Sequence, residues 1–96
     1  MIYSVYREEF PQIFYFIDEN KIGLKYNPSQ RSFSILSQDG FYSQEINFCP
    51  WTGKSLPPSL SERFSEMLES KDLSILEPSN WPEIYKDETW WLELGL

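Results

Sequence analysis

The chain has 96 residues, which is enough for one domain but not for two. Its four tryptophans, six tyrosines and seven phenylalanines indicate a packed core rather than a disordered chain. Because it contains no histidine and one cysteine, a single chain cannot form a Ser-His-Asp triad, a Cys-His pair, a histidine-ligated metal site or an internal disulfide. The composition therefore excludes several common kinds of catalytic site.

The charge balance disfavours polyanionic partners. Fifteen acidic and eight basic residues give a net charge of −7. Binding to nucleic acid or to an anionic membrane depends on lysine and arginine, and here no two basic residues are adjacent. We therefore expect neither nucleic acid nor a membrane as partner. An acidic surface favours a cationic partner, or simply keeps the protein in solution.

The sequence shows no feature of an exported or membrane-spanning protein. The N-terminus lacks a basic segment followed by an apolar stretch. The longest apolar run, residues 13–17, is far too short to cross a bilayer. A lone Cys49 is typical of a reducing compartment, so we predict a cytoplasmic location.

The first half of the chain is predicted to form strands, because it alternates between apolar and polar residues and is rich in β-branched and aromatic side chains. Short connections, including the hairpin signal Asp39-Gly40, indicate sequential antiparallel pairing in a meander. A fifth, edge strand is expected at residues 2–7. The other four expected strands span residues 12–17, 21–26, 31–37 and 42–48.

A helix is predicted at about residues 59–70. Ser59 and Glu62 have the spacing of a capping box at its start. One helical face is apolar and is expected to pack on the sheet, which gives an α+β fold with one packed helix. The apolar stripe consists of Leu60, Phe64, Met67 and Leu68.

The remaining residues, 71–96, form a tryptophan-rich C-terminal tail that contains Trp81, Trp90 and Trp91. We expect this tail to lie across the open face of the sheet, with at least two of these rings in the core. Asp87 is a suitable cap for a last short helix. Tryptophan is also common in binding hot spots, so a recognition patch is the alternative interpretation.

The segment 49–57, Cys-Pro-Trp-Thr-Gly-Lys-Ser-Leu-Pro, has the pattern of a zinc knuckle with one ligand missing. Thr52 stands where the second cysteine would be, and four Cys or His ligands are not available. We therefore predict no metal and no cofactor. Without a neighbouring base, Cys49 is expected to be a buried small hydrophobe rather than a nucleophile.

This segment, with Ser59-Leu60 and the residues Ile84 to Asp87 and Trp90-Trp91, is similar to a family of small bacterial proteins of uncharacterised function. Its members typically read Cys-Pro-Trp-Cys-Gly-Lys, then Leu-Pro, and end in a Tyr…Trp-Trp tail. Many also carry a cysteine pair near the N-terminus, which this chain lacks. The resemblance implies a degenerate member that kept the fold and lost the metal, and it assigns no catalytic residue.

The acidic residues are concentrated toward the C-terminus, since residues 49–96 hold nine acidic and four basic side chains. We predict a non-catalytic, acidic protein-binding domain, specifically an immunity or antitoxin protein that neutralises a basic toxin. The alternatives are a degenerate zinc-knuckle protein with another binding or structural role and, third, a small enzyme that uses carboxylates. The expected partner-binding residues are Glu62, Glu66, Glu69, Asp87, Glu88 and Trp91.

Overall fold

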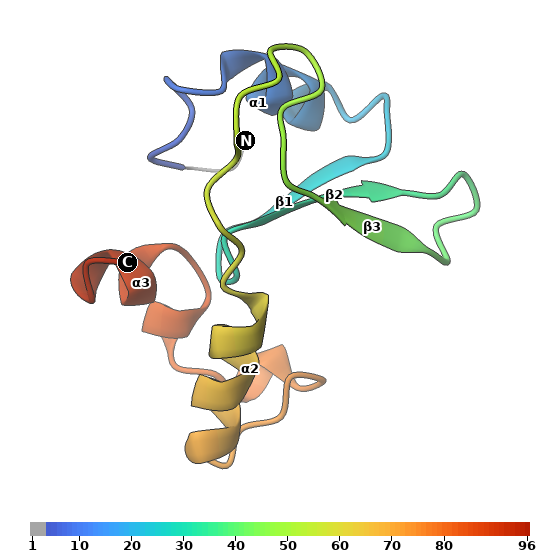
Figure 1. The fold of residues 1–96 in the computed structure, drawn as a ribbon. Helices are drawn as coiled ribbons and strands as arrows, with labels where there is room; N and C mark the ends of the chain where they lie inside the picture. The colour runs from blue at the N-terminus through green and yellow to red at the C-terminus, as the bar shows by residue number, and fades with distance from the viewer. Residues whose placement is uncertain (1–3) are drawn as a thin grey trace.

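The computed structural model describes residues 4–96 and has a three-stranded antiparallel sheet (Figure 1). The strands are β1 (Leu24–Asn27), β2 (Ser32–Leu36) and β3 (Ser43–Ile46), in the order β1-β2-β3. The helices are α1 (Pro11–Glu19), α2 (Ser61–Ser70) and α3 (Thr89–Glu93), with short 3-10 turns η1 (Pro78–Asn80) and η2 (Glu83–Tyr85). The α+β class and the meander order agree with the sequence. The prediction of four or five strands is wrong, and helix α1 was not predicted.

The segment predicted as the strand 12–17 lies in helix α1. Pro11 occupies the first turn, where its missing N–H is not needed, and Asn20 ends the helix in a left-handed conformation with φ 54°. The β-branched and aromatic residues suggested a strand, but a short apolar run is compatible with either element. The apolar positions Phe10, Ile13, Phe14 and Ile17 follow helical spacing and all contribute to the core.

The expected edge strand at 2–7 is also absent over its described part. Residues 4–7 form a turn in which the Arg7 amide donates to the Ser4 carbonyl oxygen, and residues 2–3 lie outside the described residues. The Arg7 guanidinium makes two hydrogen bonds of 2.9 and 3.0 Å to the Asp18 carboxylate on α1. This ion pair joins residues 4–7 to α1, and these residues do not pair with a strand of the sheet.

One face of the sheet packs against α1. Tyr26 pairs with Phe33, and Phe14 of α1 places its ring edge-on to both, at centroid distances of 5.3 and 5.8 Å. Ile35 follows Phe33 by two residues on β2 and shares this face, but it is 45% exposed. The predicted strand 42–48 ends at Ile46, and Phe48 is left exposed beyond it.

Helix α2 ends at the predicted residue and begins two residues later than expected. Its start has no side-chain cap, so the predicted capping box is not formed. The Ser59 hydroxyl instead accepts a hydrogen bond of 3.2 Å from the Ser61 amide. The predicted apolar stripe is confirmed, with Leu60, Phe64 and Leu68 buried and Met67 packed beside them.

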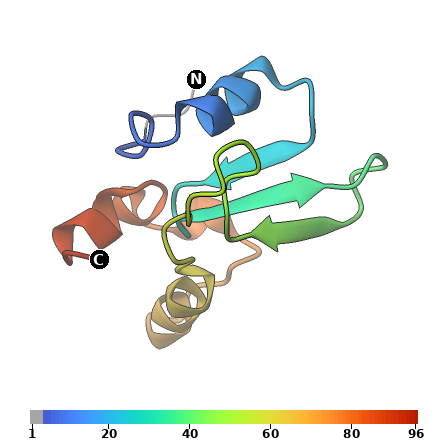
Figure 2. The same ribbon diagram turned by 45° about the horizontal axis from the view of Figure 1, so that its top comes forward.

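The stripe of α2 packs on the C-terminal tail and not on the sheet. The Phe64 ring lies 5.0 Å from Trp81 and 5.7 Å from Trp90. Figures 1 and 2 show α2 and the tail together on one side of the molecule, away from α1. The predicted helix-on-sheet and tail-on-sheet packing is therefore wrong. Helix α1 covers the apolar face of the sheet, and the other face is polar. The apolar stripe of α2 is therefore buried against the tryptophans of the tail instead.

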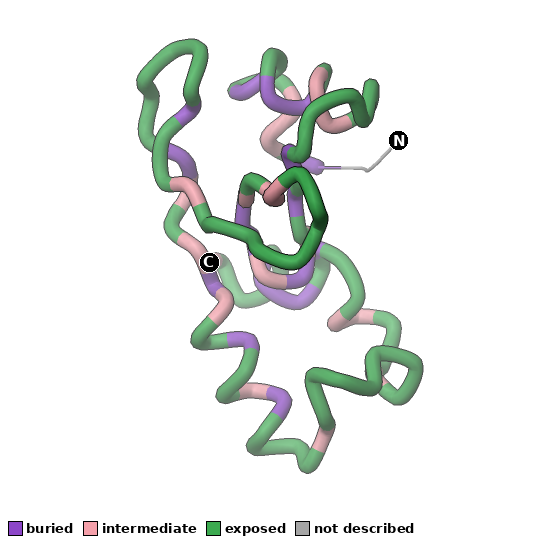
Figure 3. Tube along the Cα trace, turned by 90° about the vertical axis from the view of Figure 1, so that its right-hand side faces the viewer, coloured by how far each residue is buried: buried purple, intermediate pink, exposed green. Residues whose placement is uncertain are grey.

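The buried side chains form two clusters, and we call the parts of the chain that contain them the N-terminal lobe (residues 4–56) and the C-terminal lobe (residues 57–96). Figure 3 marks the buried positions along the chain. Tyr6 contacts both clusters and stacks on Trp91 at 6.0 Å. The indole N–H groups of Trp90 and Trp91 donate to the carbonyl oxygens of Ser29 and Pro28 in the β1–β2 turn, at 2.7 and 2.8 Å. The tail therefore packs against the β1–β2 turn rather than across the open face of the sheet.

Candidate functional site

Three of the predicted binding residues form one exposed acidic stripe on α2. Glu62, Glu66 and Glu69 are spaced by four and three residues, which places them on the same side of the helix. Glu62 and Glu66 also line a shallow hollow of about 410 Å³ at the start of α2, together with Arg63. The apolar stripe faces the tryptophans, so these carboxylates face solvent.

Asp87 is exposed as well, but it lies on a different element, just before α3. Its carboxylate accepts a hydrogen bond of 2.8 Å from the Thr89 amide. The predicted cap at Asp87 is not formed, because Glu88 stands at the N-cap of α3 and the helix has no side-chain cap. Asp87 also does not line the hollow at the start of α2.

Trp91 cannot belong to a binding surface in this structure, because only 1% of it is exposed. Its ring stacks on Tyr6, its N–H donates to Pro28, and the Arg31 guanidinium lies 5.1 Å from its centroid. The expectation that at least two of the three tail tryptophans belong to the core is confirmed by Trp90 and Trp91. The alternative interpretation of Trp91 as a recognition residue is contradicted.

Glu88, the other predicted binding residue, is 2% exposed and joins the two lobes. Its carboxylate accepts hydrogen bonds from the Ser4 hydroxyl at 2.6 Å, from the Val5 amide at 2.9 Å and from the Tyr26 phenol. Burial, together with the hydrogen bond to Glu88, raises the pKa of the Tyr26 phenol above its ordinary value.

Both Glu88 oxygens are therefore occupied by donors from the chain itself. A carboxylate in this state is a structural acceptor rather than part of an exposed binding surface. The predicted surface position of Glu88 is therefore wrong. The one signal in the sequence is that Glu88 lies two residues before the pair Trp90-Trp91.

The knuckle-like segment keeps a tight hairpin around Cys49. The Cys49 amide donates to the Lys54 carbonyl oxygen and the Gly53 amide donates to the Cys49 carbonyl oxygen, both at 2.8 Å. Gly53 has φ +73°, a conformation that glycine adopts without strain. The turn that would wrap a metal is thus present, although Thr52 replaces the second ligand.

The Cys49 side chain lies in the core of the N-terminal lobe, as predicted. Burial raises the pKa of its thiol. Hydrogen bonds from the Thr52 hydroxyl and the amides of Trp51 and Thr52, together with the charge of Lys54, outweigh burial, so that the pKa lies below its ordinary value. Within residues 4–96, no three cysteine or carboxylate side chains come together in an arrangement that could hold a metal ion.

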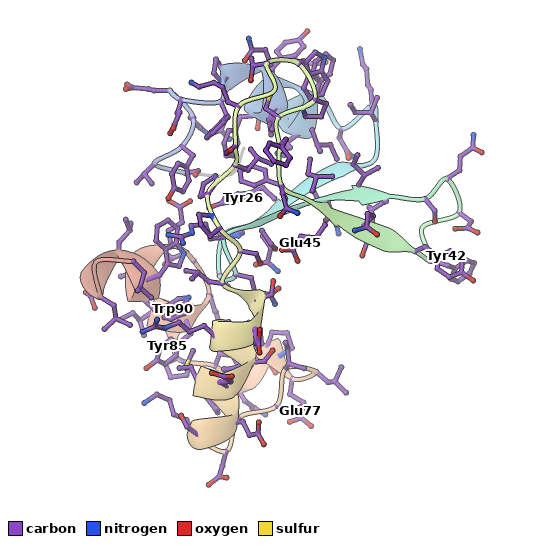
Figure 4. All side chains as sticks on the ribbon, viewed as in Figure 1. Tyr26, Tyr42, Glu45, Glu77, Tyr85 and Trp90 are labelled. Carbon is purple, nitrogen blue, oxygen red and sulfur yellow. The ribbon has the colours of Figure 1, made fainter. Side chains whose placement is uncertain are left out.

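A further exposed surface, which the sequence analysis missed, lies at the end of the sheet beyond α1. We call Ile22, Ile35, Tyr42 and Trp51 the sheet-end surface, because they line two neighbouring hollows that share Ile35. Tyr42, at the β2–β3 hairpin (Figure 4), is 74% exposed, and the other three are 43–45% exposed. Contiguous exposed apolar side chains of this kind are typical of protein contact surfaces.

Comparison with protein families gives one match. The model of a family described as a domain of unknown function (DUF6980) matches residues 9–93, so the chain belongs to that family. Comparison with curated proteins and with solved structures found no significant match. In the part of the chain that the structure describes, every helix is too short to reach across a bilayer.

Proposed function

We propose that this protein is a non-catalytic protein-binding domain that acts in the cytoplasm as an immunity or antitoxin protein, neutralising a basic toxin. The observation that carries this proposal is the segregation of charge between the lobes. Residues 57–96 contain nine acidic and three basic side chains, and every one of these acids except Glu88 is exposed. Residues 1–56 contain six acidic and five basic side chains.

A surface with charge of one sign speeds the encounter with a partner of opposite charge and repels partners of like charge. The acidic stripe on α2 is suited to this role, because its side chains are held on a helix and point away from the core. The sheet-end surface offers apolar area that can anchor a complex after encounter. Together these features support binding to a basic protein.

The test is first to find whether a neighbouring gene encodes a basic protein, and then to measure the association kinetics of the chain with that protein at two salt concentrations. Reversing Glu62, Glu66 and Glu69 to lysine should slow association and weaken its dependence on salt. The matched control reverses Glu8, Glu9 and Glu19, which are exposed acids of the N-terminal lobe. Equal association rates for the two variants at low salt would overturn the proposal.

A second candidate is a degenerate zinc-knuckle protein with another binding or structural role. It is favoured by the hairpin around Cys49, which keeps the amide donors of a metal knuckle and presents them to a lone thiol. Because Cys49 is buried in the core, Cys49→Ala should lower stability under either candidate. The second candidate is distinguished by its prediction that reversing Glu62, Glu66 and Glu69 leaves association with the basic protein unchanged.

A further inference from the structure

The second face of the sheet is polar and borders the start of α2. Here a cleft of about 470 Å³ is lined by Ser32, Ser34 and Ser43 and flanked by Lys25 and Glu45. The Ser61 hydroxyl at the first turn of α2 donates to Gln30 at 3.1 Å and approaches Glu45 at 3.5 Å. Figure 4 shows Glu45 between the sheet and α2. We call this hollow the sheet cleft.

The register of the sheet places two opposite charges on either side of the cleft. Lys25 on β1 lies opposite Ser34 on β2, which lies opposite Glu45 on β3. Two strand spacings separate the backbones of Lys25 and Glu45 by roughly 10 Å. Among residues 4–96, neither charge makes an ion pair with the other or with any other side chain.

The hydroxyls of the three serines that line the cleft are free to bind a ligand. Within the described residues, the side chains of Ser32, Ser34 and Ser43 make no hydrogen bond to the protein. A hydroxyl can donate to a carbonyl oxygen and can also accept from an N–H. Across the strands the cleft therefore presents the Lys25 cation, the Ser34 hydroxyl and the Glu45 anion, with the Ser32 and Ser43 hydroxyls to either side of this line.

We propose that the sheet cleft binds an extended segment of the partner protein that carries a basic residue for Glu45 and an acidic residue three positions away for Lys25. In a polyproline II conformation, three residues span about 9 Å and return the side chain to the same side. In a β-strand, residues three apart point to opposite sides. The unpaired carbonyl groups of a polyproline II segment are the acceptors that the serine hydroxyls require.

The charge and the polar lining of the cleft also disfavour nucleic acid and hydrophobic small molecules as ligands. A single lysine cannot supply the counterion release on which nucleic-acid binding depends. The lining is mostly polar, with Tyr26 and Pro28 as its apolar members, which suits a hydrophobic small molecule poorly. This inference rests on the proposed function, because the ligand is taken to be a segment of the partner protein.

The probe is the peptide acetyl-Ala-Arg-Pro-Ala-Glu-Ala-amide, which has its charges three positions apart and a proline that favours the polyproline II conformation. It is titrated into the isotope-labelled full chain and followed by amide chemical shifts. We expect saturable shifts at millimolar peptide that map to Lys25, Ser34 and Glu45. The control peptide, acetyl-Ala-Arg-Pro-Glu-Ala-Ala-amide, has the same composition with its charges two apart and should bind more weakly.

Glu45→Gln should weaken peptide binding about threefold to fivefold, as expected for one exposed ion pair. Glu9→Gln makes the same charge change outside the cleft and should leave the affinity unchanged. Absence of saturable shifts in the cleft, or equal affinity for the two peptides, would overturn the inference. Because the peptide assay contains no toxin and leaves the α2 stripe intact, its failure is distinguishable from failure of the immunity proposal.

Discussion

Glu88→Ala is the substitution that we expect to damage this fold most specifically. The carboxylate is buried between the lobes and accepts hydrogen bonds from Ser4, Val5 and Tyr26. Its removal leaves the Ser4 and Tyr26 hydroxyls buried without an acceptor, whereas water can reach the partly exposed Val5. Each unsatisfied buried donor costs about 1–3 kcal/mol, which predicts a loss of about 2–6 kcal/mol in the free energy of unfolding.

A loss of that size is a large fraction of the roughly 5–15 kcal/mol that stabilises a typical domain. Equilibrium unfolding in urea measures it directly as a change in the midpoint at constant slope. Glu88→Gln keeps the shape and one acceptor oxygen, so it should cost less than Glu88→Ala. A double-mutant cycle with Tyr26→Phe should give a coupling energy of about 0.5–3 kcal/mol. If Glu88→Ala costs less than about 1 kcal/mol, the carboxylate does not hold the lobes together.

Three further predictions concern the C-terminal core, the knuckle and alkaline pH. Phe64→Ala should cost about 3–5 kcal/mol in urea unfolding, because its fully buried ring packs on two tryptophans; a cost below about 1 kcal/mol would contradict this packing. Elemental analysis should find no stoichiometric zinc and a chelator should leave the melting curve unchanged, because Thr52 replaces a ligand; bound zinc would refute the degenerate-knuckle interpretation. The folded state keeps the Tyr26 phenol protonated at a pH where unfolded tyrosine ionises, since its folded pKa is raised. Stability should therefore fall as the pH rises above about 10; Tyr26→Phe should show a shallower fall, and an identical pH dependence would argue against the buried phenol.

The helix α2 and the short strands were predictable because their signals are local. The spacing of Leu60, Phe64 and Leu68 repeats every three to four residues, and a helix must place such residues on one side. Leu24 and Tyr26 alternate with Lys25, which requires one face of a strand to be buried. The absence of histidine likewise limited the chemistry of the protein before any fold was known.

The error at 12–17 shows where local signals fail. Isoleucine and phenylalanine favour strands by propensity, but burial decides between a helix and a strand when the run is short. Phe14 contacts Tyr26 and Phe33, which are distant in the chain, so the choice depended on the sheet that the segment covers.

The sequence by itself therefore determined the charge of each region, the elements with clear periodicity and the kinds of chemistry that are absent. Tertiary structure decided which acids are exposed, because burial depends on contacts between residues that are distant along the chain. Glu88 and Asp87 are adjacent acids, yet Ser4 and Tyr26 bury Glu88 between the lobes and leave Asp87 in solvent. Long-range packing also brought Lys25 and Glu45 to opposite sides of one cleft, which their separation along the chain does not reveal.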